Sequence, residues 1–304
     1  MRVALLSGGV GGARMARGLA ACGGPLTVVV NVGDDEEVYG VHVSPDLDTV
    51  AYTLSGRGGP EGWGVAGDTF TVLGHLERLG ADTSFRLGDA DLALNLLRTE
   101  ALRSGERLSA VTARLAAALG VGPAILPATD DRLRTRVRTA DGTWLPFQEY
   151  FVLREHRDHV VEVRYDGAIA AAPAPGVVEA IDDADLVVVA PSNPPLSIWP
   201  ILAVPGIREA VARRPAVAVS PLFAGKALKG PADRVMAGLG LPPGNAGVPA
   251  AYPGLLDVLV VDRGDAADVE ALASPRLRVL AADTRIAEPE AAARFAAWLL
   301  DAVG

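Results

Sequence analysis

The chain has very few of the residues that form covalent or metal cross-links. Only one of its 304 residues is a cysteine, Cys22, so no disulfide can form within the chain, and a reducing cytoplasm is the expected location. The four histidines show neither a zinc-ligand spacing nor a helical His-Glu-x-x-His pattern. No Ser-His-Asp or Cys-His arrangement is evident either, so catalysis by a protein nucleophile is not expected.

Long apolar runs and a basic surface are also missing. No apolar run is long enough to span a bilayer, and the first one, residues 3–6, is too short for a signal peptide, so no membrane partner is expected. The net charge of -9 argues against nucleic-acid binding, which needs a basic surface. Small-molecule substrates are the expected partners, and a homodimer is the default for such an enzyme.

Lysine is scarce, and its placement is informative. Of the 28 basic residues only two are lysines, Lys226 and Lys229, and both follow the apolar run 216–220. An ammonium group is a compact point charge suited to phosphates, so both are candidate phosphate ligands. The segment is not a Walker A loop, because Ala227 follows Lys226. The alternative is that both are ordinary solvated lysines.

The order of apolar runs predicts an α/β fold. Short β-branched runs alternate with helical patterns, which is typical of a Rossmann-like, doubly wound, mostly parallel sheet. Strands are expected at 2–6, 26–30, 186–190, 216–220, 258–261 and 277–281, with helices at 13–22 and 288–302. We treat 1–304 as one domain with a helix-rich stretch at about 49–120 and a β-rich insertion at about 122–167. Strands are expected within this insertion at 133–139, 148–153 and 160–165.

Carboxylates gather directly after the predicted strand 26–30. Asp34, Asp35, Asp46 and Asp48 are expected over the edge of the sheet, where ligands of open α/β sheets bind. Clustered carboxylates require a proton or a hard cation, so Asp34, Asp46 and Asp48 are candidate ligands of Mg²⁺. The alternative is a solvated loop in which Asp48 caps a helix that begins near Thr49.

A glycine-rich segment follows the first strand. Gly9, Val10, Gly11 and Gly12 are expected to present backbone amides to a phosphate at a helix N-terminus. A tight turn that needs glycine is the alternative. The segment is not the dinucleotide fingerprint, because Arg14 stands where the third glycine belongs, and the second strand ends at Asn31 instead of a carboxylate.

Two further loops carry candidate ligand-binding groups. Ser192 and Asn193 follow the strand 186–190 and could bind a base or a sugar, or cap the next helix. Arg86 precedes Asp89, a candidate helix cap, and offers its guanidinium to an anion. Trp63 is either a stacking or a packing residue, and the alternating arginines 132, 134, 136 and 138 predict a strand face turned to solvent or to a partner subunit.

Five segments together resemble one enzyme family. They are residues 7–12, 43–49, 86–89, 191–194 and 226–231, and their order and spacing over nearly the whole chain are more specific than any one motif. On these motifs the chain resembles the 2-phospho-L-lactate transferases of coenzyme F420 biosynthesis, including their phosphoenolpyruvate-dependent relatives.

The resemblance implies transfer of a phospholactate or phosphoenolpyruvate group from a guanosine diphosphate adduct to the ribityl hydroxyl of the deazaflavin Fo, with release of GMP. It also implies that Asp48 and Arg86 contact the deazaflavin. The residues add further roles: Asp46 and Asp48 hold Mg²⁺ or take the hydroxyl proton, and Asp34 is a further ligand. The donor is expected to bind through a set that comprises Gly9, Val10, Gly11, Gly12, Ser192, Asn193, Lys226 and Lys229.

Some alternatives stay open at this point. Which aspartate is the base and which the metal ligand is undecided, and the Ala-, Gly- and Arg-rich composition only favours enolpyruvate over lactate or glycerate. A nucleotide-sugar-binding regulator similar to the gluconeogenesis factors would share the general fold, but Glu36 and Glu37 replace its glycine- and serine-rich segment. A nucleotide-dependent oxidoreductase is disfavoured by Arg14 and Asn31.

Overall fold

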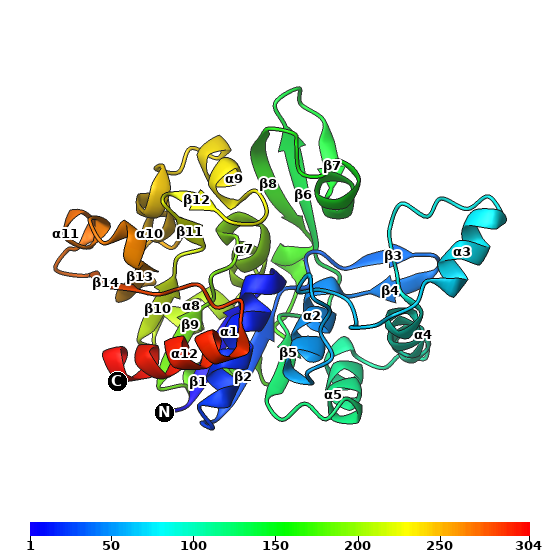
Figure 1. Cartoon of the computed structure of the whole chain (residues 1–304), viewed down its shortest axis with the longest axis horizontal. Coiled ribbons are helices and arrows are strands. Elements are labelled where there is room, and N and C mark those ends of the chain that lie inside the picture. Colours follow the sequence, from blue (N-terminus) through cyan, green and yellow to red (C-terminus); the bar gives the residue numbers. More distant parts are fainter.

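A seven-stranded sheet in which all neighbouring strands run parallel organises the fold. The computed structural model describes all 304 residues and orders the strands β14-β13-β10-β9-β1-β2-β5 (Figure 1). These strands are β1 (Val3–Ser7), β2 (Leu26–Val30), β5 (Ala124–Pro127), β9 (Leu186–Val189), β10 (Ala216–Val219), β13 (Val258–Asp262) and β14 (Arg278–Ala282). The predicted doubly wound, Rossmann-like α/β fold is confirmed. The strand order reverses between β1 and β9, and ligands bind at such a point in this class of sheet.

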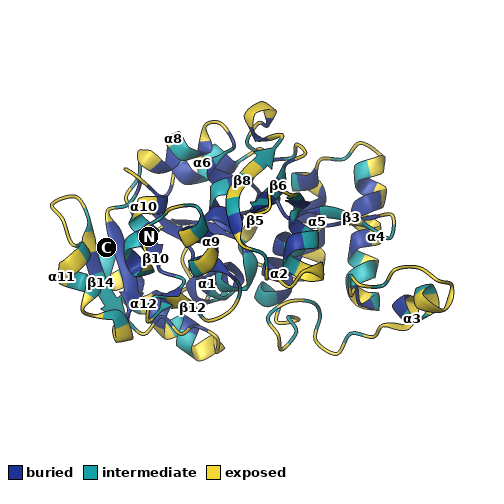
Figure 2. Ribbon diagram, turned by 90° about the horizontal axis from the view of Figure 1, so that it is seen from above, coloured by how far each residue is buried: buried dark blue, intermediate teal, exposed yellow.

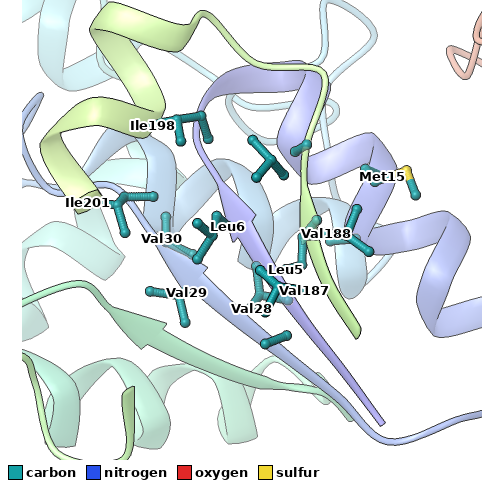
Figure 3. Packing of buried hydrophobic residues seen from close by; sticks show 14 of the residues in the cluster. Leu5, Leu6, Met15, Val28, Val29, Val30, Val187, Val188, Ile198 and Ile201 are labelled. Carbon is teal, nitrogen blue, oxygen red and sulfur yellow. The ribbon is translucent and has the colours of Figure 1, made fainter. Parts of the chain in front are cut away.

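Helices cover both faces of this sheet. Figures 1 and 2 show α1 (Gly9–Ala21) and α12 (Pro289–Val303) on one face, and α6 (Val177–Asp182) and α8 (Ile207–Ala212) on the other. The central strands are therefore buried on both sides, which explains their unbroken runs of valine, leucine and alanine. Figure 3 shows this packing: Leu5, Val28 and Val187 come from three adjacent strands and are fully buried.

A helical arm extends from one end of the sheet, to the right in Figure 1. It contains α3 (Thr71–Arg78), α4 (Asp89–Arg103) and the hairpin of β3 (Glu36–Val38) and β4 (Val41–Val43), and α5 (Leu108–Ala118) joins it to the sheet. The remaining short elements are α2 (Pro45–Leu54), α7 (Trp199–Leu202), α9 (Ala232–Gly238), α10 (Gly247–Ala251), α11 (Asp268–Leu272), β11 (Leu222–Phe223) and β12 (Lys226–Ala227). None of the helices combines the length and the apolar character needed to cross a membrane.

The β-rich region is shorter than the predicted range 122–167. Its antiparallel sheet contains β6 (Arg134–Thr139), β7 (Trp144–Pro146) and β8 (Val160–Asp166), whereas β5 pairs in parallel with β2 and belongs to the main sheet. The strand expected at 148–153 is wrong, because residues Glu149–Leu153 form a π-helical turn. Phe147 and Tyr150 are buried three residues apart, which is a helical spacing that the alternation of the segment concealed.

The arginine face of β6 is neutralised within the insertion. Arg136 pairs with Asp166 and Arg138 with Glu162, and Arg164 stacks 4.4 Å from the centre of the Trp144 ring. The alternation predicted for these arginines is confirmed, since residues 134, 136 and 138 are partly exposed and the residues between them are buried.

Candidate functional site

A cavity of about 730 Å³ lies beyond the carboxyl ends of the parallel strands. Its wall includes residues that follow five of them: Gly8 after β1, Asp34 after β2, Pro191 after β9, Pro221 after β10 and Thr284 after β14. Ten of the twelve predicted site residues line it, namely Gly9, Val10, Gly11, Asp34, Asp46, Asp48, Arg86, Ser192, Asn193 and Lys229. Gly12 and Lys226 do not.

The glycine segment belongs to α1 and does not precede it. The helix was expected to begin at about residue 13, but it begins at Gly9. A Cβ atom on Gly11 would lie 2.2 Å from the carbonyl oxygen of Pro191, and one on Gly12 would lie 2.3 Å from Ser7 Oγ. Gly11 and Gly12 therefore allow α1 to approach β1 and the loop after β9, while the first turn of the helix still faces the cavity.

Asp46 is held by two donors from neighbouring strand ends. Its Oδ1 accepts the backbone amide of Gly9 at 2.8 Å, and its Oδ2 accepts Asn31 Nδ2 at 2.9 Å. Asn31 in turn accepts the Gly33 amide through its own Oδ1, at 2.8 Å, which fixes its orientation. Burial outweighs these donors and raises the pKa of Asp46 to about 6.

Asp34 lies at the same wall with a free oxygen. The residue is 6% exposed, and its Oδ1 has no hydrogen-bond partner. Burial, and then the charge of Asp46, raise its pKa well above the usual value. An unpartnered buried carboxylate beside a second carboxylate is stabilised by a proton or by a hard cation.

Asp48 is engaged differently, by an arginine that sequence reasoning missed. Arg98 of α4 donates from Nη1 to Asp48 Oδ2 at 3.0 Å and from Nη2 to Asp48 Oδ1, and both residues are almost fully buried. Asp48 lies in the first turn of α2, whose N-cap is Ser44, so the alternative of Asp48 as a helix cap is wrong. Arg98 could have been noticed from the sequence, because polar residues recur at helical spacing at Asp91, Asn95 and Arg98.

The predicted three-carboxylate metal site is not preformed. No three His, Cys, Asp or Glu side chains form a group that could hold a metal ion. The single guanidinium of Arg98 already contacts both oxygens of Asp48, which leaves Asp34 and Asp46 as the two groups whose raised pKa values and hard oxygen donors fit a divalent cation. Mg²⁺ typically uses only one or two carboxylates and completes its shell with water and phosphate oxygens.

The arm supplies a second group of cavity residues. The Arg86 guanidinium stacks 4.6 Å from the centre of the Phe70 ring, and Asp91 Oδ1 on α4 accepts the hydroxyl of Tyr52, which lies on α2, at 2.8 Å. Asp89 is the first residue of α4, and its carboxylate accepts the amides of Thr71 and Val72, so it caps α3 and not its own helix. The exposed Trp63 also lines the cavity.

The opposite wall comes from the loops after β9 and β10. Ser192 Oγ donates to the carbonyl of Gly8 at 2.6 Å, and Asn193 Oδ1 accepts the Leu196 amide at 3.3 Å, so the helix-capping alternative holds for Asn193. Lys229 is exposed at the cavity, with Nζ 3.6 Å from Glu61 Oε2. Acidic residues from the start of the chain and one of the two lysines thus share a single cavity.

Comparison with known proteins agrees with this architecture. A UPF0052 family protein from Bacillus halodurans has a similar structure, with a TM-score of 0.65, 19% identity and 98% of each chain covered, a likeness that concerns the fold alone. A phosphoenolpyruvate transferase from Kitasatospora aureofaciens is 43% identical, covering 97% of this chain and 96% of its own. A 2-phospho-L-lactate transferase from Methanopyrus kandleri is 40% identical, covering 99% and 97%.

The sequence model described as 2-phospho-L-lactate transferase CofD matches residues 3–295. This match extends over the sheet, the arm, the insertion and every wall of the cavity. The chain therefore belongs to the CofD family of transferases of coenzyme F420 biosynthesis.

Proposed function

We propose that this protein transfers a phospholactate or phosphoenolpyruvate group from a guanosine diphosphate adduct to the ribityl hydroxyl of the deazaflavin Fo and releases GMP. One observation carries the proposal: Asp34 and Asp46, the first turn of α1 and Lys229 line the same cavity at the point where the strand order reverses. Carboxylates for a cation, amides for phosphate and an ammonium group are what a diphosphate donor needs.

The proposed step is an in-line displacement. The ribityl oxygen attacks the phosphorus distal to guanosine, a new P–O bond forms, and the bond from that phosphorus to the bridging oxygen breaks, so GMP leaves with the electron pair. The hydroxyl proton passes to a carboxylate. Asp34 suits this role because one of its oxygens is unpartnered and its pKa is raised, whereas both oxygens of Asp48 are held by Arg98.

A divalent cation fits the same residues. Asp34 and Asp46 would hold Mg²⁺, which when bound would offset the charge of the diphosphate. The amides of Val10 and Gly11 in the first turn of α1 orient the phosphates, and Lys229 adds one positive charge. Arg86 and Asp48 face the acceptor, as the family resemblance implies. Lys226 lies outside the cavity wall and therefore does not contact the phosphates as the sequence predicted.

The acid group that the donor carries is either lactate or enolpyruvate. Relatives of similar identity are described as phosphoenolpyruvate transferase and as 2-phospho-L-lactate transferase. We favour enolpyruvate as this acid group, because the chain is rich in Ala, Gly and Arg. We also propose that the protein is a homodimer. The regulator of the gluconeogenesis-factor type is not favoured, because curated relatives that cover nearly the whole chain are named as transferases.

The test combines binding with product analysis. Purified protein is titrated with Fo by fluorescence and then incubated with Fo, Mg²⁺ and a mixture of guanosine diphosphate adducts of lactate, enolpyruvate and glycerate. Saturable Fo binding and one new phosphodiester product with stoichiometric GMP, read by mass spectrometry, are expected. Absence of Fo binding, or Fo binding with no product from any donor, would reject the proposed transfer.

A further inference from the structure

Arg98 is a deeply buried charged side chain near the cavity, yet it is not part of the cavity wall. It is 2% exposed and lies on α4, while its partner Asp48 is 5% exposed, lies on α2 and does line the cavity. A buried ion pair is costly to form unless its geometry is good and its remaining donors are satisfied. The surroundings of Arg98 meet most of this requirement.

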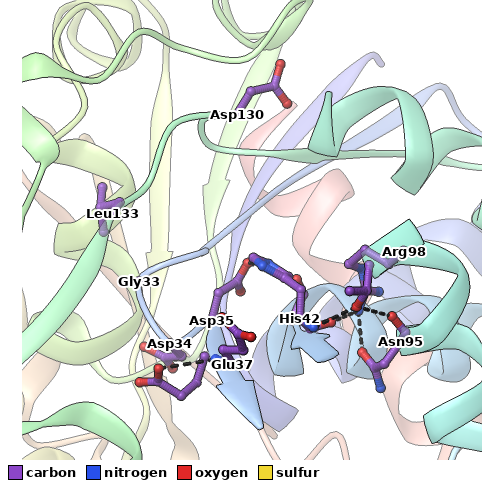
Figure 4. A network of polar contacts seen from close by, with 12 residues as sticks. Gly33, Asp34, Asp35, Glu37, His42, Asn95, Arg98, Asp130 and Leu133 are labelled. Carbon is purple, nitrogen blue, oxygen red and sulfur yellow. Dashed lines mark hydrogen bonds and ion pairs between the residues drawn. The ribbon is translucent and has the colours of Figure 1, made fainter. Parts of the chain in front are cut away.

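Acceptor oxygens from three residues surround the guanidinium. Besides the two oxygens of Asp48, Nη1 donates to Asn95 Oδ1 at 2.5 Å and lies 3.4 Å from the carbonyl oxygen of His42. Asn95 is itself fixed, because its Nδ2 donates to the carbonyl of Asp91 at 2.8 Å. Figure 4 shows Arg98 and Asn95 beside His42, with Asp35 and Asp34 on the other side of His42. The guanidinium can therefore take only one orientation.

Two further carboxylates, Asp35 and Asp91, lie near the Asp48–Arg98 pair. Asp35 is held by Ser44 Oγ at 2.8 Å and lies 2.9 Å from His42 Nε2, and Asp91 accepts the Tyr52 hydroxyl. Burial and the charge of Asp48 raise the pKa of Asp91 to about 6. Arg98 is the one buried arginine among these carboxylates.

We propose that Arg98 is a positioning residue: it holds both carboxylate oxygens of Asp48 in one orientation, in which Asp48 accepts a hydrogen bond from the acceptor substrate. This inference rests on the proposed transfer to a hydroxylated acceptor. It assigns acceptor orientation to the Asp48–Arg98 pair, in which each Asp48 oxygen keeps a lone pair for the cavity, and it leaves proton transfer to Asp34.

The test compares Arg98→Lys and Arg98→Met with the control Arg103→Met on the same helix, where the side chain is exposed. With Fo as acceptor, Arg98→Lys is expected to lower kcat/KM for Fo by about 10- to 100-fold, because one ammonium cannot hold both oxygens, while KM for the donor stays within about twofold. Arg98→Met, which removes every Arg98 donor to Asp48, is expected to lower kcat/KM for Fo at least as much as Arg98→Lys does, again with KM for the donor within about twofold.

Folding is controlled separately. Thermal unfolding accompanies every assay, and if Arg98→Met does not fold, Arg98→Lys and the neutral pair Asp48→Asn/Arg98→Gln carry the test. The neutral pair is expected to fold and to lose Fo affinity with unchanged donor affinity. A folded Arg98→Lys variant with the wild-type kcat/KM for Fo would overturn the inference. Absence of product from the wild-type enzyme would instead reject the proposed function, so the two failures are distinguishable.

Discussion

The side-chain amide of Asn31 donates to Asp46 Oδ2 at 2.9 Å and so connects the end of β2 to the first turn of α2. The backbone amide of Asn31 also bonds to the carbonyl of Ser7 at 2.9 Å, which places it beside the end of β1. A dinucleotide-binding sheet usually carries a carboxylate at this position. Here the position carries a donor instead, and its function is to orient a carboxylate that faces the cavity.

Asn31→Asp tests this role. The substitution replaces a donor by a second carboxylate, so the pKa of Asp46 is expected to rise beyond about 6. The acidic limb of the kcat/KM profile should move to higher pH, with a loss of about 10- to 100-fold at pH 7. Asn31→Ala removes the donor without adding a charge, so its kcat/KM at pH 7 should lie between those of the wild type and Asn31→Asp. A wild-type profile for a folded Asn31→Asp protein would contradict the role.

Much of the fold is predictable because its signals are local. The runs that became β1, β2, β9 and β10 are short, apolar and β-branched, and in a parallel sheet such strands are buried on both faces. The carboxyl ends of these strands share one edge, which is why the carboxylates, the glycines and Ser192 could be expected near one another. For these residues, the place in the fold follows from their position directly after a predicted strand.

The features that were missed depend on contacts between distant residues. Arg98 and Asp48 are 50 positions apart, and nothing in either segment alone indicates that their side chains meet. The π-helical turn at Glu149–Leu153 depends on Tyr150 packing into a small core and on Gln148 Nε2, which donates to the carbonyl of Asp34 at 2.6 Å. Alternation in a six-residue segment cannot distinguish that turn from a strand.

Stability should depend on pH through Asp46. Its pKa is raised on folding from 3.8 to about 6, so its contribution is fully present below about pH 4 and is lost as the pH rises through about 6. The free energy of unfolding without metal should fall by the order of 2 to 3 kcal/mol over that window from this group. Urea unfolding between pH 4.5 and 7.5 measures the slope, and Mg²⁺ should restore stability at the upper end.

Asp46→Asn is the control for that slope. The variant cannot titrate at this position, so its pH dependence should be flatter than that of the wild type, while the contribution of Asp91 is common to both proteins. Its absolute stability also includes one lost hydrogen bond, because an amide cannot accept from both Gly9 and Asn31. Equal slopes in the two proteins would contradict the burial of an ionisable Asp46.

The close approach of α1 to the loop after β9 is testable with two glycines in helices. Gly11→Ala places a Cβ atom 2.2 Å from the Pro191 carbonyl oxygen and should destabilise the fold by about 1 to 3 kcal/mol. Gly74→Ala in α3 meets only the flexible end of Arg78, at 3.7 Å, and should stabilise by up to about 1 kcal/mol through helix propensity. Urea unfolding of both variants should therefore give opposite signs.

The two lysines form a matched pair for the donor site. Both lie in the segment after β10, but Lys229 lines the cavity and Lys226 does not. Lys229→Ala is expected to raise KM for the guanosine diphosphate adduct by about 5- to 50-fold, the loss of one charge-assisted phosphate contact of about 1 to 2 kcal/mol, with little change in KM for Fo. Lys226→Ala should change either constant by less than about twofold, as an exposed surface substitution does.

Lys229 also faces Glu61, and the variant Glu61→Gln separates the ion pair from the phosphate contact. If the ion pair alone mattered, Glu61→Gln would reproduce the defect of Lys229→Ala. If Lys229 contacts the phosphates, Glu61→Gln leaves KM for the donor unchanged or lower. Equal effects of Lys226→Ala and Lys229→Ala on the donor would refute the assignment of Lys229 to the phosphates.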